Sequence, residues 1–433
     1  MIAQIIRGWW YNLQLQQALK QDKFQRADYF LKKLDCLGIK LSLSAKLYKQ
    51  NLQAKNAVSY YKKETANIAK RLQNNPSQSN LLQPNDNFIK YVHQCFKFVE
   101  HDSNKLQITG IDRPVFDSLE TALADFVEEE INKVNPESRE LKLKEAVDDL
   151  LMLKKGIDPT YSYYFSPHIY LLKYFTENIY CTYLAWFLVY KSGLLPKDIK
   201  ILDLAAGPST SVYGLALLLS SAANFSVLSE GHILYYSLEQ QAALQYRGLQ
   251  FWRRYIEFLG HSTNAYFRFN TCNIFDYQNY NSKLPDRFFN FIVISHCFFY
   301  DSQKRQESFQ IYSQIFQHNL CPDGYVLLIV QGRKLFNMYD VFPSEEVTEE
   351  QAVIEIFLDE LGLHLEWYQY LTSTGKRTSV KTGFAKFAQE NLPPQNYLKS
   401  ARQKYLQESY ITHYTIDDYV ILAKKTDDKL SNI

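Results

Sequence analysis

Short apolar runs alternate with amphipathic segments from residue 200 onward. The apolar runs predict strands at residues 201–204, 233–238, 267–272, 289–295, 325–330, 363–371 and 414–423. The intervening segments predict helices at residues 210–222, 240–259, 303–319 and 349–361, with a helical insertion at about 384–408. Because strands and helices alternate along the chain, we expect an α/β fold built on a mostly parallel sheet.

A helical pattern precedes this region. Apolar residues recur at helical spacing over residues 3–71, and a polar, turn-rich segment follows them. The pattern divides the chain into a basic helical domain at 1–71, a linker at 72–87, an acidic and mostly helical region at 88–160, and an α/β domain at 161–433. Residues 161–190 are dense in aromatic rings, which either pack a helix on the sheet or line a substrate entrance.

The turn after the first predicted strand is the strongest candidate for a binding site. An apolar run ends at Asp203 and is followed by small residues, including Ala205, Gly207 and Ser209. Small side chains let a ligand approach the backbone, and a carboxylate at a strand end can accept hydrogen bonds from it. This order predicts a nucleotide-sized site between a buried strand and a helix.

Composition limits the classes of protein that the chain can belong to. The six cysteines lie far apart, with no Cys-x-x-Cys pair and no closely spaced histidine, so no metal site is predicted. The N-terminal apolar run is too short for a signal peptide, and the most hydrophobic window, residues 178–190, is too short to span a bilayer. We therefore expect a cytoplasmic protein with reduced thiols.

Charge is distributed unevenly, although the net charge is only +2. Residues 1–71 contain 14 Lys and Arg against 4 Asp and Glu, a net charge of +10. Residues 100–149 contain 14 acidic against 6 basic residues, a net charge of −8. The basic helices could bind RNA or an acidic protein, could dock on the acidic segment of the same chain, or could simply be solvated.

Five motifs follow one another in the order found in class I S-adenosylmethionine-dependent methyltransferases, and residues 165–433 resemble that family. Segments 201–209, 235–239, 268–276, 289–296 and 320–328 carry the likeness. The resemblance implies a Rossmann-like, seven-stranded, mostly parallel sheet with a C-terminal antiparallel hairpin, preceded here by the helical N-terminal region. Ala205 and Ser209 stand where the family has glycines, and Asn273 stands where it usually has an acid.

The resemblance also implies roles for individual residues. The cofactor S-adenosylmethionine would be held by Asp203, Ala205, Gly207, Ser209, Glu239, Asn273 and Ser295. Glu239 would accept hydrogen bonds from both ribose hydroxyls, and Asn273 would contact adenine. Ser295, His296 and Tyr300 follow the fourth strand, where the family contacts the acceptor, and a neutral His296 could take a proton. Each of these residues could instead serve as a cap, a turn or part of the core.

Three functions remain open from the sequence. The first is a methyltransferase that acts on RNA or protein through its basic N-terminal helices. The second is a non-catalytic assembly protein with the same fold, because a fold does not fix a function. The third is a small-molecule methyltransferase whose acceptor enters past the aromatic segment, which would require a closed pocket at the strand ends.

Overall fold

The computed structural model describes residues 10–15, 17–18, 24–36, 80–155, 159–225, 232–260, 263–279, 283–378 and 383–426. The chain divides into two units, Met1–Ser79 and Asn80–Ile433. In the first unit, helix α2 (Phe24–Cys36) packs Ala27, Phe30, Leu31 and Leu34 with Leu15 and Ala18. The remainder of the basic helical domain predicted at 1–71 lies outside the described residues.

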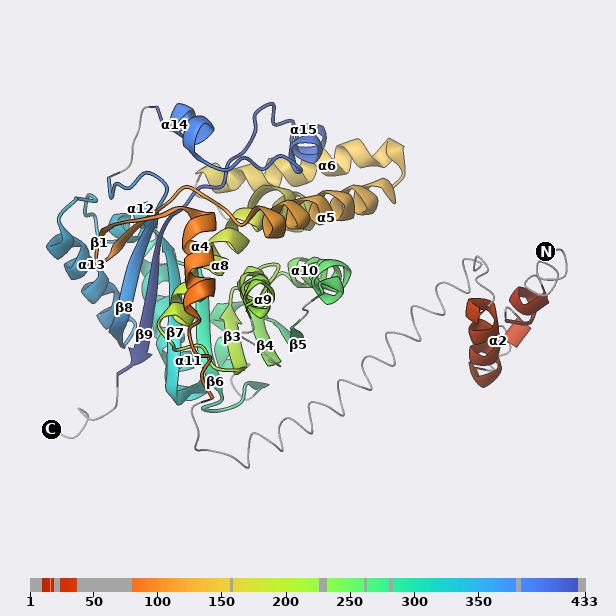
Figure 1. Ribbon diagram of the computed structural model, residues 1–433, viewed down its shortest axis with the longest axis horizontal. Helices are drawn as coiled ribbons and strands as arrows, with labels where there is room; N and C mark the ends of the chain where they lie inside the picture. Colours follow the sequence, from red (N-terminus) through yellow and green to blue (C-terminus); the bar gives the residue numbers. More distant parts are fainter. Residues whose placement is uncertain are drawn as a thin grey trace. The chain divides into compact units, whose positions relative to one another are not determined.

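Nine strands of the second unit form one sheet in the order β1-β2-β8-β9-β7-β6-β3-β4-β5 within the described chain (Figure 1). They are β1 (Phe98–Asp102), β2 (Lys105–Ile108), β3 (Asp198–Leu204), β4 (His232–Glu239), β5 (Asn264–Thr271), β6 (Phe289–Ser295), β7 (Leu320–Gln331), β8 (Leu363–Thr372) and β9 (Asp417–Lys425). Strands β3 to β7 run parallel, whereas β9 is antiparallel to both β7 and β8. The expected C-terminal antiparallel pair is thus β8 and β9.

The sheet has nine strands rather than the seven expected. The hairpin of β1 and β2 adds the two further strands, because β2 pairs in parallel with β8. Three central residues of β1 are exposed, so this edge strand shows little of the apolar alternation that reveals a half-buried strand. The seven strands from β3 to β9 contain the predicted set, and β6 has the bounds that its apolar run predicted.

Helices cover both faces of the sheet. They are α4 (Asp86–Phe96), α5 (Arg113–Asn132), α6 (Pro136–Leu150), α7 (Ser166–Tyr170), α8 (Thr176–Lys191), α9 (Thr210–Ala223), α10 (Ala242–Tyr255), α11 (Ser302–Asn319), α12 (Gly332–Asn337), α13 (Val347–Glu360), α14 (Phe384–Asn391) and α15 (Lys399–Leu406). Alternate strand residues face two cores: Phe291 and Val293 pack with α8 and α9, and Ile292 and Ile294 pack with α11 and α13. The result is a three-layer α/β domain.

Part of the acidic region is paired within this unit. Glu128, Glu129 and Glu130 near the end of α5 form ion pairs with Lys404 of α15 and with Arg254 and Arg247 of α10. These contacts hold α5 against two helices that are distant in sequence. None of the helices described here is both long and apolar enough to cross a membrane.

Candidate functional site

The turn between β3 and α9 has an unusual backbone. Ala205, Gly207 and Ser209 have φ angles of 54°, 53° and 68°, which lie in the left-handed region. Such angles are uncommon for residues other than glycine and cluster at functional sites. Helix α10 also approaches closely, because a Cβ added to Gly248 would lie 2.3 Å from the carbonyl oxygen of Pro208. The backbone therefore turns sharply between β3 and α9, and Gly248 of α10 packs directly against the turn.

Glu239, the last residue of β4, reaches across to this turn. Its Oε2 accepts a hydrogen bond from the Gly207 backbone N–H at 2.8 Å, and its Oε1 accepts one from Gln241 N–H at 2.8 Å. Burial, which leaves Glu239 only 7% exposed, raises the pKa of its carboxyl. A carboxylate offers about four acceptor positions, so two bonds orient it and leave others for a ligand.

A cavity of about 890 Å³ opens at the carboxyl ends of these parallel strands. Six of the residues predicted from the sequence line it: Ala205, Gly207, Glu239, Asn273, Ser295 and His296. This volume lies within the range of roughly 300–1,000 Å³ that small-molecule sites occupy, and ligands of open α/β sheets bind at this edge. The structure thus brings most of the predicted site together.

Three predicted residues do not line this cavity. Asp203 is buried, where its Oδ2 accepts hydrogen bonds from Ser211 Oγ and Tyr235 Oη, and burial raises the pKa of its carboxyl to about 7. Ser209 is also buried, directly before α9. Tyr300 is 53% exposed, with Lys334 Nζ over its ring. Asp203 therefore contacts buried side chains and not the cavity, and Tyr300 is largely exposed to solvent.

Asn273 is exposed at the end of the segment that follows β5. Its Oδ1 accepts a hydrogen bond from Phe275 N–H at 3.0 Å, and its carbonyl oxygen accepts one from Asp276 N–H at 2.9 Å. These bonds cap a short 3₁₀ helix, Ile274–Asn279. The Asn273 side chain thus has a local structural role while it lines the cavity.

His296 lies directly after β6 and is less basic than the sequence suggested. Burial, together with the nearby charge of Lys334, lowers the pKa of its imidazole to about 4. Its Nε2 lies 3.1 Å from Asp418 Oδ1, and its Nδ1 lies 3.4 Å from Ser295 Oγ. At neutral pH His296 is uncharged, and a base of this strength takes up protons poorly.

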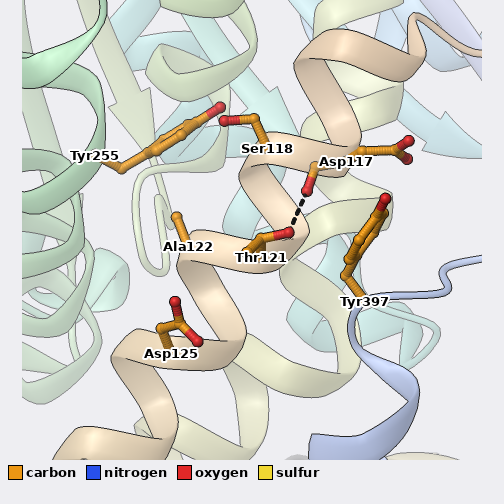
Figure 2. Close-up of a pocket in the computed structure, with 7 residues that line it drawn as sticks. All are labelled: Asp117, Ser118, Thr121, Ala122, Asp125, Tyr255 and Tyr397. Carbon is orange, nitrogen blue, oxygen red and sulfur yellow. Dashed lines mark hydrogen bonds between the residues drawn. The ribbon is translucent and has the colours of Figure 1, made fainter.

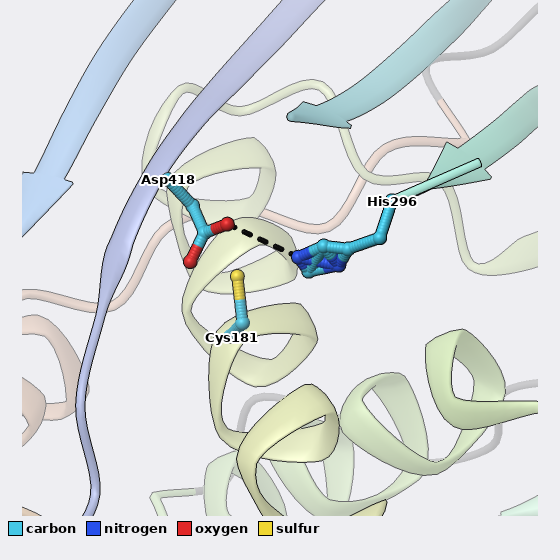
Figure 3. A group of neighbouring side chains, drawn as sticks. All are labelled: Cys181, His296 and Asp418. Atoms are coloured by element: carbon cyan, nitrogen blue, oxygen red, sulfur yellow. Dashed lines mark hydrogen bonds and ion pairs between the residues drawn. The ribbon is translucent and has the colours of Figure 1, made fainter. Parts of the chain in front are cut away.

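Several polar residues of the cavity were missed from the sequence, among them Glu177, Cys181 and Asp418. Glu177 and Cys181 come from α8, and Asp418 comes from β9. Burial raises the pKa of Glu177 to about 7 and that of Asp418 to about 6. Figure 3 shows Cys181, His296 and Asp418 side by side. The local signal in the sequence was Glu177, an acid directly before the strongly apolar segment 178–190. The spacing of Cys181, His296 and Asp418 along the chain does not show that the three side chains lie together.

The aromatic segment 161–190 divides between the larger cavity and the core. Tyr161, Tyr170 and Tyr174 line the cavity. Tyr183 and Trp186, farther along α8, are fully buried, and the Trp186 indole N–H donates to Ser211 O at 2.9 Å. The beginning of the segment therefore lines the larger cavity, and its end packs against the sheet.

A second cavity, of about 450 Å³, lies along α5 (Figure 2). Asp117, Ser118, Thr121 and Asp125 of that helix line it together with Tyr255 and Tyr397. Thr121 Oγ1 donates a hydrogen bond to the Asp117 carbonyl oxygen within the helix. This cavity contains none of the residues predicted for function, and we assign it no ligand.

The residues of the larger cavity fit S-adenosylmethionine. The cofactor carries a ribose with two neighbouring hydroxyls, a sulfonium and no phosphate. Glu239 retains acceptor positions for hydroxyls, and the left-handed turn at Gly207 brings backbone close to the cavity without a Cβ. A dinucleotide glycine pattern is not required, because there is no pyrophosphate to bind.

Strand order and pairing define an α/β fold built on one mixed sheet. No known protein family matches the chain, and no curated protein is significantly similar to it. Solved structures similar to it include an S-adenosylmethionine-dependent methyltransferase from Methanosarcina mazei, which is 15% identical over 53% of this chain and 94% of that one, with a TM-score of 0.32.

Two other solved structures show the same degree of likeness. Loganic acid methyltransferase with S-adenosylhomocysteine is 10% identical over 61% of this chain and 96% of that one, with a TM-score of 0.31. The 16S rRNA (adenine(1408)-N(1))-methyltransferase from Catenulisporales acidiphilia is 11% identical over 53% of this chain and 87% of that one, with a TM-score of 0.30.

Proposed function

We propose that this chain is an S-adenosylmethionine-dependent methyltransferase. The observation that supports it best is the hydrogen bond between Glu239 and the Gly207 turn, at the mouth of a cavity of suitable size. A carboxylate held in this way can accept from two ribose hydroxyls while the turn contacts the methionine end. When bound, the cofactor supplies an electrophilic methyl group.

The remaining residues of the cavity would hold the acceptor. In-line displacement depends chiefly on bringing the acceptor atom close to the methyl group in the correct direction. Ser295 and Tyr170 line the cavity beside the Gly207 turn and would orient the acceptor. Glu177, whose pKa burial raises to about 7, is better matched than His296 to take up a proton near neutral pH.

The charge of the lining favours an uncharged or cationic acceptor of small size. Four carboxyl groups face two amines: Glu177, Glu239, Asp417 and Asp418 against Lys304 and Lys334. A phosphate backbone would be repelled by such a lining. The basic charge of residues 1–71 supports a separate RNA or protein partner for that part of the chain.

Calorimetric titration of the full chain with S-adenosylmethionine tests the activity class. We expect saturable binding at one site and at least a 10-fold loss of affinity in Glu239→Ala, because a charged hydrogen-bond acceptor is removed. Glu366→Ala is the matched control, since Glu366 of β8 pairs with Lys424 of β9 and does not line the cavity. Absence of binding to the folded wild-type chain would refute the proposal.

A further inference from the structure

Three potential metal ligands from separate elements meet in the larger cavity. Cys181 comes from α8, His296 follows β6, and Asp418 is the second residue of β9. One ligand atom from each lies within 4.8 Å of the other two. The His296 Nε2 and Asp418 Oδ1 atoms are 3.1 Å apart, and Figure 3 shows the Cys181 sulfur beside them.

The backbone fixes these side chains in place. His296 has a φ angle of 62°, a conformation that a histidine rarely adopts, and its N–H donates to Ile329 O at 2.9 Å. Its second ring nitrogen faces Ser295 Oγ at 3.4 Å. Asp418 is held in register between β7 and β8, opposite Gln331 and Leu371. Metal-binding histidines commonly use their second nitrogen in this way, which fixes the ring.

The chemistry of the three groups selects among metal ions. A thiolate, an imidazole and a carboxylate are the ligand types that Zn²⁺ accepts, whereas Mg²⁺ and Ca²⁺ take oxygen ligands. Bonds of about 2.0–2.3 Å to zinc place ligand atoms roughly 3–4 Å apart. The cluster therefore needs only a small contraction to reach that geometry. The two negative charges of an ionised Cys181 and Asp418 would balance the charge of the ion.

We propose that Cys181, His296 and Asp418 bind a zinc ion and leave its fourth coordination position to a water or small ligand in the cavity. All three residues line that cavity, so the fourth position is reached from it. Binding breaks the S–H bond of Cys181 and forms a zinc–sulfur bond, and the thiol proton passes to the solvent. The proposal does not depend on methyl transfer, since the three ligands bind the ion whether or not the cofactor is bound.

The test is a titration of the full chain, stripped of metal by a chelator, with Co²⁺ and then Zn²⁺. We expect one equivalent of Co²⁺ to produce a sulfur-to-cobalt charge-transfer band, which Zn²⁺ abolishes by displacement. Cys181→Ser should abolish the band, and Asp418→Asn should lower zinc affinity by about 100-fold or more, because ligands matter at least as much as their supporting residues. Cys272→Ser is the matched control, since Cys272 lines the same cavity outside the cluster and should leave both results unchanged.

Two outcomes would overturn the zinc proposal. One is the absence of a charge-transfer band in the folded wild-type chain, which would leave a hydrogen-bonded cluster without metal. The other is equal zinc affinity in wild type and Asp418→Asn. If Cys181→Ser fails to fold, Asp418→Asn and the wild-type spectrum still decide the matter. Cofactor titration of the chelated chain is read separately, so a failure of methyl-donor binding leaves the zinc result intact.

Discussion

Two regions of the described chain bury charged groups and treat them in opposite ways. Beside the β1–β2 hairpin, Glu350 accepts hydrogen bonds from Arg377 Nε at 2.6 Å, Tyr419 Oη at 2.6 Å and Tyr368 Oη at 2.9 Å. Arg377 also pairs with Asp102 of β1 at 2.8 Å. Although burial alone would raise the pKa of Asp102, its bonds to Arg377 lower it. Arg377 thus links Asp102 of the hairpin to Glu350 of α13, and the two tyrosines link Glu350 to β8 and β9.

Glu177 and Glu239, which line the larger cavity, and Asp203, which is buried outside its lining, have hydrogen bonds that offset the effect of burial on their pKa only in part. Burial raises the pKa of Glu177, Asp203 and Glu239, although hydrogen bonds to each act in the opposite direction. Perturbed pKa values of this kind cluster at functional sites, although buried structural groups such as Glu120 also show them. The comparison teaches that a paired buried charge joins elements together, whereas a partly compensated one remains available to a ligand or a proton.

The largest effect is expected from removal of the cation in the paired cluster. Arg377→Ala leaves Glu350 buried without its charged partner and should lower the free energy of unfolding by about 3–5 kcal/mol. Denaturant unfolding measures this loss. The double variant Arg377→Met/Glu350→Leu should recover much of it, because the unpaired charge is also gone. Full stability in Arg377→Ala would mean that the cluster does not hold the hairpin in place.

The next effect concerns the pH dependence of stability at Asp203. Its folded pKa of about 7 lies above the usual value of 3.8, so the folded chain holds the proton more tightly than the unfolded chain does. This contribution to stability is complete below pH 3.8 and is lost as the pH rises towards 7 and slightly above. Tyr235, Ser211 and the charge of Glu239 are the groups that act on Asp203.

Asp203→Asn should remove this slope. Relative to wild type, the variant should gain about 2–4 kcal/mol of unfolding free energy between pH 4 and pH 8, because each pKa unit is worth about 1.4 kcal/mol. Urea unfolding at a series of pH values measures the difference. If the unfolding free energies of the two proteins changed with pH in parallel, Asp203 would have its ordinary pKa. It would then not belong with Glu177 and Glu239, whose pKa burial raises.

A smaller loss should follow from crowding the turn. In Gly248→Ala the new methyl group would lie 2.3 Å from Pro208 O, so α10 must move, at a cost of about 1–3 kcal/mol. The displaced turn should also bind S-adenosylmethionine more weakly in a calorimetric titration. Gly260→Ala is the control, because no atom lies within 4 Å of its added Cβ. Equal effects of the two substitutions would contradict the proposed support of the turn by α10.

The smallest effect is expected at an exposed ion pair. Lys386 and Glu390 of α14 lie one helical turn apart, and the Lys386 side chain is 80% exposed. Lys386→Ala should change the unfolding free energy by no more than about 0.5 kcal/mol, because solvent screens such pairs. Thermal unfolding at low and high salt measures it. If the loss of unfolding free energy approached that of Arg377→Ala, burial would not explain why the Arg377–Glu350 pair stabilises the protein more than the Lys386–Glu390 pair does.

Local pattern predicted the central strands well because each is a short apolar run with its own boundaries. The predicted run 289–295 became β6, and the insertion expected at 384–408 contains α14 and α15. The β1–β2 hairpin was missed as a pair because most of β1 is exposed, and Arg377, which pairs with Asp102 of β1, lies 275 residues farther along the chain. No local pattern records a partner at that distance.

The candidate site was predictable where a residue ends a parallel strand or lies within three residues of its end. Gly207, Glu239 and Ser295 line the cavity because parallel strands end at one edge of the sheet. Tyr300 lies five residues beyond β6 and is 53% exposed, although its neighbour Phe299 lines the cavity. Cys181 and Asp418 come from a helix and from an antiparallel strand, so their meeting with His296 is a product of packing rather than of spacing.

The most direct measurement of the central claim is a crystal structure of the full chain grown with S-adenosylhomocysteine. We expect the ligand to bind in the larger cavity, with both ribose hydroxyls within hydrogen-bond distance of the Glu239 carboxylate. Its amino acid end should lie against the Gly207 turn. A ligand bound elsewhere, or a cavity that excludes it at saturating concentration, would contradict the account.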